Sequence, residues 1–460
     1  MSATSEPVFQ SVYPYTGEVI GDYPLMNRRD IVERTERAEK MFAYWRQQSL
    51  EERARCFLSL AKLLREQAEK FALLISREMG KHITESRAEV EKCVWTCTYF
   101  AKEAHKMLAE VAVATQHSNK IVFEPVGAVL AIMPWNFPFW QVFRYAVPTL
   151  LAGNVTILKH APSVCGCALA IEDLFRRAGF PEGVFQVLII GISDVEFAIR
   201  QPVIQGVTLT GSEAAGSKVA SVAGRYIKKT VLELGGSDPV LVLDDADIGE
   251  AAKTAVQSRM MNAGQSCICG KRFLVTRHNA AAFSEAVREE IKKIRQGDPL
   301  SPDTQMGPLA RLDLAEKLEQ QMKRSLDRGA KISLGGQREE CNFQPTLLLN
   351  GQANMPVFHE ETFGPLATIF VSRTENELIK RANSSNFGLG ASIWSRDITR
   401  AEAIARKIEA GAVFINAMVR SDPRLPFGGI KQSGYGRELS DVGMKEFCNI
   451  KTITIAGGTD

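Results

Sequence analysis

The stretch Ala128-Val-Leu-Ala-Ile-Met133 opens a series of short apolar segments that decides the fold of this chain. The later segments are Asn154-Val-Thr-Ile-Leu158, Phe185-Gln-Val-Leu-Ile189 and Val207-Thr-Leu-Thr210. Each is followed by roughly 10–20 residues compatible with a helix, and this alternation predicts stacked βα units with a parallel sheet. Ligands of such sheets bind at the carboxyl ends of the strands. The loops expected there are 134–138, 159–163 and 211–216.

A second strand–helix series begins after Leu232-Glu-Leu-Gly-Gly236. Its expected segments are 239–243, 248–262, 272–276 and 280–294. Upstream of both series, residues 50–79 carry apolar side chains at helical spacing, and we expect a second long helix over 85–108. The sequence therefore predicts an α/β protein with two parallel-sheet units.

The composition is that of a globular chain with balanced charge. Of 460 residues, 45% are hydrophobic, and 56 Lys and Arg face 53 Asp and Glu, for a net charge of +3. This balance argues against nucleic acid or a membrane surface as the main partner. The most apolar stretch, 127–140, is interrupted by Pro134, Asn136 and Pro138, so it falls short of the roughly 20 apolar residues that span a membrane. The N-terminus lacks the pattern of a secretory signal.

The cysteines and histidines suggest neither a disulfide framework nor a metal site. Nine cysteines, an odd number, are spread along the chain, which favours a reducing, cytoplasmic location. The six histidines show no paired spacing, and Cys165-x-Cys167 and Cys267-x-Cys269 lack the companion ligands of a zinc site. We therefore expect no metal.

Gly211-Ser-Glu-Ala-Ala-Gly216 follows a strand and opens a helix, where free N–H groups favour a phosphate. Ser217-Lys218 reverses the order that a P-loop requires, and no G-x-G-x-x-G is present. Close packing of a helix on a strand explains the two glycines equally well.

Three further residues have side chains suited to catalysis. Cys267 lies in a polar, tightly turned segment where a thiolate is useful, although lone cysteines are often inert. Glu233 is a carboxylate among apolar neighbours, which suits a general base or an ion pair. Asn136, in Pro134-Trp-Asn-Phe-Pro138, offers an amide donor for an oxyanion, although rigid packing of the turn is the simpler reading.

Together these motifs make the sequence resemble the aldehyde dehydrogenase superfamily over nearly its whole length, with the closest likeness to succinate-semialdehyde dehydrogenases. The matching motifs, in family order, are Pro134-Trp-Asn-Phe-Pro138, Leu232-Glu-Leu-Gly-Gly236, Gly264-Gln-Ser-Cys267, Glu360-Glu-Thr-Phe-Gly-Pro365 and Pro426-Phe-Gly-Gly-Ile-Lys-Gln-Ser-Gly434. The resemblance implies that Cys267 attacks the aldehyde to form a thiohemiacetal and then a thioester. It assigns the oxyanion contact to Asn136 and activation of the hydrolytic water to Glu233.

The resemblance also implies an NAD or NADP cofactor. Its expected contacts are Trp135, Lys159, Pro162, Ser163, Gly211, Ser212, Gly216, Leu234, Glu361 and Phe363. NAD-preferring members often carry a Glu where this chain has Pro162, so we expect NADP to be tolerated. The preference between the two cofactors stays open.

For the substrate, the resemblance implies an arginine eight residues after Asn136, and Arg144 stands there as the candidate for a distal carboxylate. A second arginine of one branch is replaced by Met261. Ser421 and Arg424 are candidates to compensate, whereas we expect Arg420 to face solvent. Glutarate semialdehyde or an amino aldehyde is the alternative substrate.

By the same resemblance we expect two Rossmann-like parallel-sheet domains plus a small β bridging element. The expected bounds are 1–112 with 128–234 for the dinucleotide-binding domain, 235–440 for the catalytic domain, and 113–127 with 441–460 for the bridging element. Family members are commonly homodimers or homotetramers, and 116–125 and 450–455 are the candidate assembly strands.

Two other hypotheses remain. A thiol hydrolase would pair Cys267 with a histidine, but no histidine lies in an activating motif, and the nucleotide-like βα region would have no use. A non-enzymatic binding protein would not need Asn136, Glu233 and Cys267 together. Separately, Cys269 beside Cys267 suggests a reversible disulfide that protects the nucleophile from oxidation.

Overall fold

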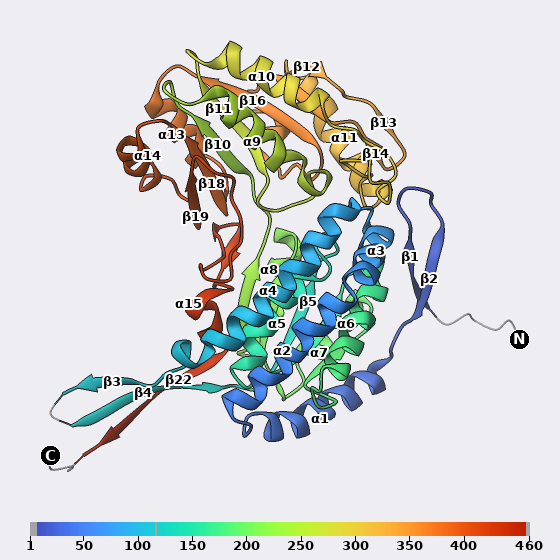
Figure 1. Ribbon diagram of the computed structural model, residues 1–460, viewed down its shortest axis with the longest axis vertical. Coiled ribbons are helices and arrows are strands. Elements are labelled where there is room, and N and C mark those ends of the chain that lie inside the picture. Colours follow the sequence, from blue (N-terminus) through green and yellow to red (C-terminus); the bar gives the residue numbers. More distant parts are fainter. Residues whose placement is uncertain (1–6, 116, 457–460) are drawn as a thin grey trace, which may run out of the picture.

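The computed structural model describes residues 7–115 and 117–456, and it contains two large, mostly parallel sheets that lie one above the other along the long axis of the molecule (Figure 1). Residues 1–6, 116 and 457–460, which belong to the expected segments 1–112, 113–127 and 441–460, lie outside the described residues.

The first sheet has the strand order β21-β9-β8-β5-β6-β7. Its strands are β5 (Ala128–Met133), β6 (Val155–His160), β7 (Phe185–Val187), β8 (Ile204–Thr210), β9 (Lys229–Glu233) and β21 (Gly434–Tyr435). Strands β5 to β9 pair in parallel, and β5 and β6 are almost entirely buried because helices cover both faces of the sheet. This sheet confirms the predicted βα series.

The helices around the first sheet include α1 (Arg28–Trp45), α2 (Leu50–Glu66), α3 (Ala68–Met79), α4 (Ile83–Met107), α5 (Trp140–Leu151), α6 (Cys165–Arg177), α7 (Val195–Ile199) and α8 (Glu213–Arg225). Capping boxes at Asn27 and Ser49 fix the starts of α1 and α2. α4 packs on α2, α3 and α5 and extends toward the second sheet (Figure 1).

The second sheet has the order β12-β15-β16-β11-β10-β18-β19 and is parallel apart from its edge strand β12. Its strands are β10 (Asp238–Val242), β11 (Gly270–Thr276), β12 (Lys331–Leu334), β15 (Thr346–Leu349), β16 (Leu366–Ser372), β18 (Gly390–Trp394) and β19 (Ala412–Ile415). Its helices are α9 (Ile248–Met260), α10 (Ala280–Lys292), α11 (Leu312–Leu326), α12 (Pro356–His359), α13 (Glu375–Asn383) and α14 (Ile398–Ala405). The prediction of a second parallel-sheet unit is confirmed.

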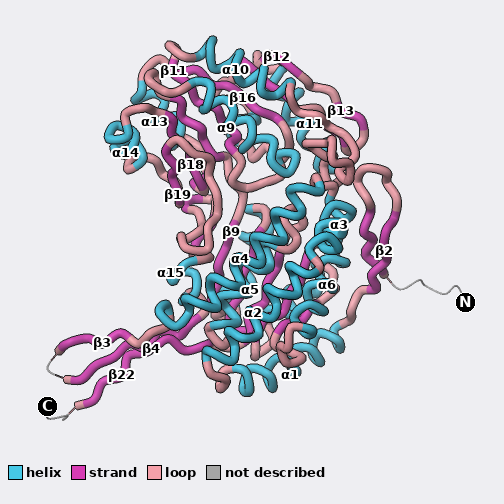
Figure 2. Tube along the Cα trace, in the orientation of Figure 1, coloured by secondary structure: helices cyan, strands magenta, loops and turns pink. Residues whose placement is uncertain are grey.

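Smaller elements lie at the margins. A hairpin of β1 (Val8–Val12) and β2 (Val19–Pro24) flanks α3, and the two-residue pairs β13 (Arg338–Glu339) with β14 (Asn342–Phe343) and β17 (Phe387–Gly388) with β20 (Ile430–Lys431) close loops. β3 (Val111–Ala114), β4 (Ser118–Pro125) and β22 (Cys448–Ile455) form a three-stranded sheet that projects from the body (Figure 2), with α15 (Ser440–Lys445) leading into β22.

One segment differs from the expected domain division. Strand β21 lies within the segment 235–440, yet it pairs with β9 of the first sheet, Gly434 opposite Glu233. Gly434 has a φ of +109°, and a side chain there would collide with the carbonyl oxygen of Leu232. A glycine therefore lets the returning chain join the first sheet, which the residue pattern alone did not indicate.

Candidate active site

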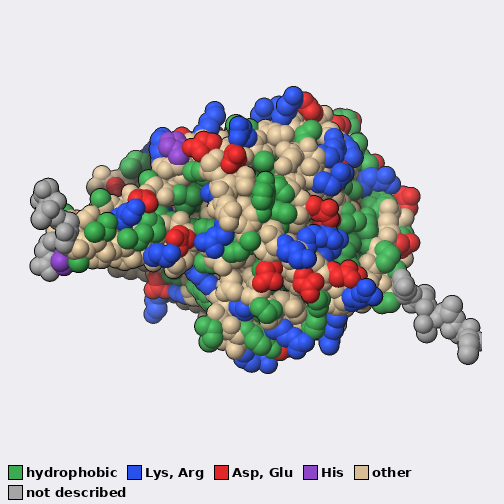
Figure 3. All heavy atoms as spheres, turned by 90° about the horizontal axis from the view of Figure 1, so that it is seen from below, with side chains coloured by type: hydrophobic (Ala, Val, Ile, Leu, Met, Phe, Trp, Pro, Cys, Tyr) green, Lys and Arg blue, Asp and Glu red, His purple; other side chains and the backbone are tan. Residues whose placement is uncertain are grey.

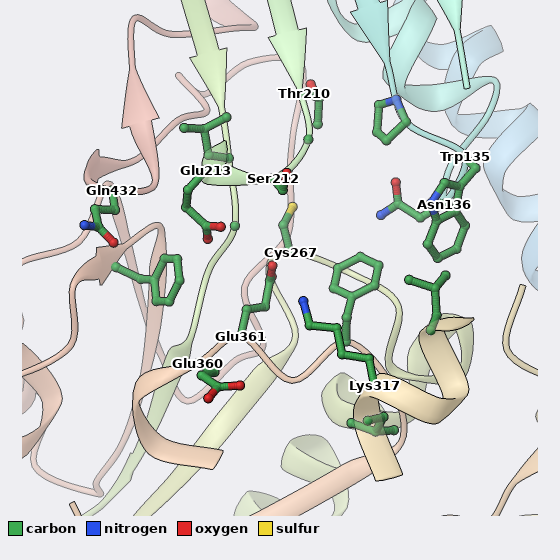
Figure 4. Close-up of a pocket in the computed structure, with 18 of the residues that line it drawn as sticks. Trp135, Asn136, Thr210, Ser212, Glu213, Cys267, Lys317, Glu360, Glu361 and Gln432 are labelled. Carbon is green, nitrogen blue, oxygen red and sulfur yellow. The ribbon is translucent and has the colours of Figure 1, made fainter. Parts of the chain in front are cut away.

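Cys267 lies where two cavities meet. The first cavity, the strand-end cavity, has a volume of about 430 Å³ and lies at the carboxyl ends of β5, β8 and β9, between Trp135, Ser212 and Leu234 (Figure 4). The second, the α4 cavity, has a volume of about 820 Å³ and is lined by side chains of α4, α5 and α9. Cys267 lines both cavities.

A strained turn presents this thiol. Asn262, Ala263 and Gly264 have φ of +55°, +51° and +74°, three consecutive residues in the left-handed region. A side chain on Gly264 would collide with the carbonyl of Gly364, so only glycine fits. The Glu85 carboxylate of α4 accepts the Asn262 N–H at 3.0 and 3.1 Å and holds the turn. Strain of this kind is typical of functional sites.

The amide of Asn136 is fixed beside the thiol. Its Nδ2 donates to the carbonyl of Gln265 at 3.0 Å, while Asn262 donates to the carbonyls of Asn136 and Gln265 at 2.8 and 3.1 Å. An amide nitrogen carries two hydrogens, so the second N–H of Asn136 remains for a ligand. The structure therefore brings the predicted oxyanion donor into the cavity wall that contains Cys267.

Lys271, which the sequence analysis did not single out, secures the other side of the thiol loop. Its buried ammonium donates to the carbonyls of Ser266 and Cys267 at 3.0 and 2.8 Å and to Glu361 at 2.9 Å. Glu361 also accepts the N–H of Gly236 at 3.0 Å. Lys271 thus links the nucleophile to a predicted cofactor contact.

The ionisation of the site is governed by burial. Burial raises the pKa of Cys267 to about 12, and the positive charges of Arg144 and Lys271 partly oppose it. Burial, followed by the charge of Glu438, raises the pKa of Glu233 well above its ordinary value. Glu233 lines neither cavity, and its carboxylate packs beside Gly428, although its charge contributes to the raised pKa of Cys267.

The strand-end cavity fits a dinucleotide. Ser212 caps α8, whose N-terminal amides suit a phosphate, and Gly211 has no neighbour closer than 3.6 Å to an added Cβ. The Trp135 and Phe363 rings meet edge to face at 5.8 Å in its wall. The buried Oε1 of Glu213 has no hydrogen-bond partner among the described residues, so a polar acceptor remains for a ligand. The donors and acceptors present match the group that the motifs imply.

Six of the predicted cofactor contacts line this cavity: Trp135, Gly211, Ser212, Leu234, Glu361 and Phe363. Lys159, Pro162, Ser163 and Gly216 do not. Gly216 instead lets α8 pack on Leu234, because an added Cβ would lie 2.6 Å from that side chain. Close packing of α8 on the neighbouring chain therefore accounts for this glycine. The buried hydroxyl of Ser163 has no hydrogen-bond partner among the described residues.

Other cavity residues were not found from the sequence. Lys317, Gln321, Glu360 and Gln432 line the strand-end cavity. Lys317 and Gln321 lie on α11, whose pattern is that of an ordinary amphipathic surface helix, so no local signal distinguished them.

Only some of the predicted substrate contacts line the α4 cavity. Arg144 and Ser421 line it, but the Arg144 guanidinium forms a buried ion pair with Glu438 and donates to Thr210 at 3.1 Å. Arg424 does not line it, because its guanidinium is paired with Asp422 at 2.6 Å. Arg420, which we expected to face solvent, is exposed and also contributes to the wall of this cavity. Arg424 as a substrate contact therefore stays a prediction, and in the structure its charge is paired with Asp422.

Two other kinds of site are absent from the described residues. No group of three or more His, Cys, Asp and Glu there could hold a metal ion. No helix within 7–115 and 117–456 is long and apolar enough to cross a membrane. On the face in Figure 3, acidic and basic side chains are interspersed.

Comparison with known proteins identifies the family. The model of the aldehyde dehydrogenase family matches residues 1–453. The chain belongs to the aldehyde dehydrogenase family. Among curated relatives, it is 44% identical over 450 residues to a probable succinate-semialdehyde dehydrogenase [NADP(+)] of Synechocystis, covering 97% of this chain and 99% of the relative. It is 42% identical over 447 residues to the succinate semialdehyde dehydrogenase [NAD(P)+] Sad of Escherichia coli, covering 96% and 97%.

Solved structures of other aldehyde dehydrogenases share the fold. A succinic semialdehyde dehydrogenase from Streptococcus pyogenes, in complex with NADP+, superposes with a TM-score of 0.95 at 37% identity, covering 97% of this chain and 99% of that one. A succinate-semialdehyde dehydrogenase from Burkholderia pseudomallei gives 0.95 at 34% identity, covering 98% and 95%. The predictions of family and fold are confirmed.

Proposed function

We propose that this aldehyde dehydrogenase oxidises succinate semialdehyde to succinate with NADP+ as the electron acceptor. The observation that carries the proposal is the place of Cys267, between a cavity suited to a dinucleotide and a cavity that contains cationic and hydroxyl side chains. The names of the relatives from Synechocystis and E. coli support the same substrate.

In the first half of the reaction, Glu233 takes the proton of the Cys267 thiol. Its raised pKa makes it a stronger base than an ordinary carboxylate. Because the carboxylate lies beside Gly428, this step requires the side chain to turn toward the thiol. The thiolate attacks the aldehyde carbon, and the free N–H of Asn136 stabilises the negative oxygen of the thiohemiacetal. The bound nicotinamide cofactor supplies the acceptor for the hydride that leaves this carbon.

In the second half, the thioester on Cys267 is hydrolysed. Glu233 takes a proton from water, which attacks the thioester carbonyl while Asn136 again stabilises the oxyanion. The C–S bond breaks, the carboxylic acid leaves through the α4 cavity, and the proton returns to the sulfur. Two easier covalent steps thus replace one difficult step.

For the cofactor, the composition of the loop after β6 supports NADP. At Pro162 no carboxylate repels a 2′-phosphate, and the neighbouring Ser163 hydroxyl is buried without a partner among the described residues. Lys159 would hold the ribose, and Ser212 with the α8 amides would hold the pyrophosphate. NAD would be used less efficiently.

We further propose that the three-stranded sheet of β3, β4 and β22 joins subunits into a homodimer or homotetramer. It projects from the body (Figure 1), and its exposed apolar side chains include Val111 at 47% and Ile450 at 61% exposure. An unpaired sheet edge with such side chains favours pairing with another copy.

The nine free cysteines agree with a reducing compartment such as the cytoplasm.

The test is the initial rate of cofactor reduction with succinate semialdehyde, glutarate semialdehyde, an amino aldehyde and butanal, each with NADP+ and NAD+. We expect the highest kcat/KM for succinate semialdehyde with NADP+. A higher value for butanal or the amino aldehyde would contradict the substrate, and a higher value with NAD+ would contradict the cofactor.

A further inference from the structure

The α4 cavity contains a cation whose charge no carboxylate neutralises. Lys92, on α4, lines this cavity, and its Nζ donates to the hydroxyl of Ser421 at 2.6 Å. The same ammonium lies 4.2 Å from the ring centre of Trp140. Within 7–115 and 117–456, no carboxylate oxygen lies within the 4.0 Å of an ion pair with it.

Two charged groups near Lys92, Arg144 and Asp422, are already paired. Arg144, the arginine expected to bind a substrate carboxylate, forms its ion pair with Glu438 and lies over the ring of Phe427. Asp422, the residue after Ser421, accepts from Arg424 at 2.6 and 2.9 Å. Arg424 therefore occupies the acid that would otherwise neutralise Lys92, and the lysine keeps its charge for a ligand.

The donor set suits a carboxylate. An ammonium has three N–H donors, of which the hydroxyl of Ser421 takes one. Ser421 accepts that bond and keeps its own O–H to donate. Met261, which lines the same cavity, adds no competing polar group. A cation with an adjacent hydroxyl donor in a mostly apolar wall favours an anion with two oxygens.

We propose that Lys92 and Ser421 bind the distal carboxylate of the substrate, with Lys92 as the specificity-determining cation of the α4 cavity. This inference rests on the proposed function and names the residues that select an acidic aldehyde. In this proposal Lys92, and not Arg144, contacts the carboxylate directly, and Arg144 has a positioning role beside Glu438.

The protonation of Lys92 gives the subsite a pH dependence. Burial and then the neighbouring positive charge of Arg144 lower the pKa of Lys92 to about 8, while Cys93, Asp422 and Glu89 oppose the shift. These groups come from α5, from α4 itself and from the loop that carries Ser421. Below this pKa the lysine is charged and attracts a carboxylate, and above it the attraction is lost.

The experiment compares Lys92→Met with Lys253→Met, because both lysines line the α4 cavity but Lys253 has a 63% exposed side chain near Glu250. We expect Lys92→Met to raise the KM for succinate semialdehyde at least about tenfold relative to the KM for butanal, in proportion to a lost charge-assisted hydrogen bond. Lys92→Arg restores most of the difference. Lys253→Met changes the ratio by less than about twofold, since exposed charges contribute little.

Two further readouts separate a binding role from a structural one. In the wild type, the KM for succinate semialdehyde rises as pH passes from about 7 to 9, while the KM for butanal does not follow, and Lys92→Met removes this difference. In a Cys267→Ala background, calorimetry with succinate shows binding that Lys92→Met weakens about tenfold.

The inference is overturned if Lys92→Met affects both aldehydes equally, if Lys253→Met has the same effect, or if succinate binding does not change. A failure of the proposed function looks different. A wild type that prefers butanal to succinate semialdehyde contradicts the substrate, and the same three variants assayed with glutarate semialdehyde still test the carboxylate subsite.

Discussion

Lys271→Met is the substitution that tests the architecture of the site most severely. The lysine side chain is fully buried, and its three hydrogen bonds join two carbonyls of the thiol loop to the Glu361 carboxylate. Methionine keeps the volume and removes the charge. Breaking a buried pair costs about 3–5 kcal/mol. Because the Glu361 side chain keeps 18% exposure, water recovers part of this cost, and we expect a loss of about 2–4 kcal/mol.

The assay is thermal unfolding together with alkylation of Cys267 by iodoacetamide. For a domain of about 200 residues, this loss of unfolding free energy corresponds to a Tm lowered by roughly 5–10 °C. The alkylation rate at a fixed pH should also fall, since Lys271 lowers the pKa of Cys267 and its loss leaves less thiolate. The matched control is Lys292→Met, whose exposed pair with Glu289 is worth at most about 1 kcal/mol. Equal Tm values for the two variants, with unchanged alkylation, would refute the reasoning.

Three other predictions concern charge in and around the site. Arg144→Met leaves Glu438 buried without its cation and should lower the Tm. The double variant Arg144→Met with Glu438→Gln should recover part of this loss. A double variant whose loss of stability equals the sum of the losses in the two single variants would show that the pair is not coupled. Burial raises the pKa of Glu85 to about 7, above its value in the unfolded chain, so its contribution to stability is favourable at low pH and is lost as pH rises through 7. Glu85→Gln should therefore gain stability relative to the wild type between pH about 5 and 8, by up to about 3 kcal/mol. A difference in thermal unfolding between the two proteins that stays constant with pH would contradict the shift. Pro162→Glu places a carboxylate near the expected 2′-phosphate and should lower kcat/KM with NADP+ about tenfold or more while sparing NAD+; equal losses with both cofactors would count against the placement.

The βα series and the nucleophile were predictable because their signals are local. The strands near Ala128 and Val207 are contiguous apolar runs. Asn136 lies in a short motif directly after the first of them, and Cys267 lies in a short motif between α9 and β11. Apolar runs and helical spacing involve residues close together in the chain, so they can be recognised in the sequence itself.

The remaining contacts depend on residues far apart in the chain. Lys271 meets Glu361 across 90 residues, and Lys92 meets Ser421 across 329. Neither lysine differs in its local pattern from a solvent-facing one on a strand or helix. Arg144 shows the same dependence, because its motif position suggested a free cation and folding places Glu438 against it. Partner identity, which decides whether a buried charge binds a ligand or a neighbour, is set by tertiary packing.

The central claim is that Cys267 carries the covalent chemistry between the two cavities. The direct measurement is NADPH formation from succinate semialdehyde by the wild type and by Cys267→Ala under the same conditions. The account predicts steady NADPH formation by the wild type and a rate at least about 10³-fold lower in the variant, because no other nucleophile replaces the thiolate. NADPH formation by Cys267→Ala at a rate near that of the wild type, or none by the wild type with any aldehyde, would contradict it.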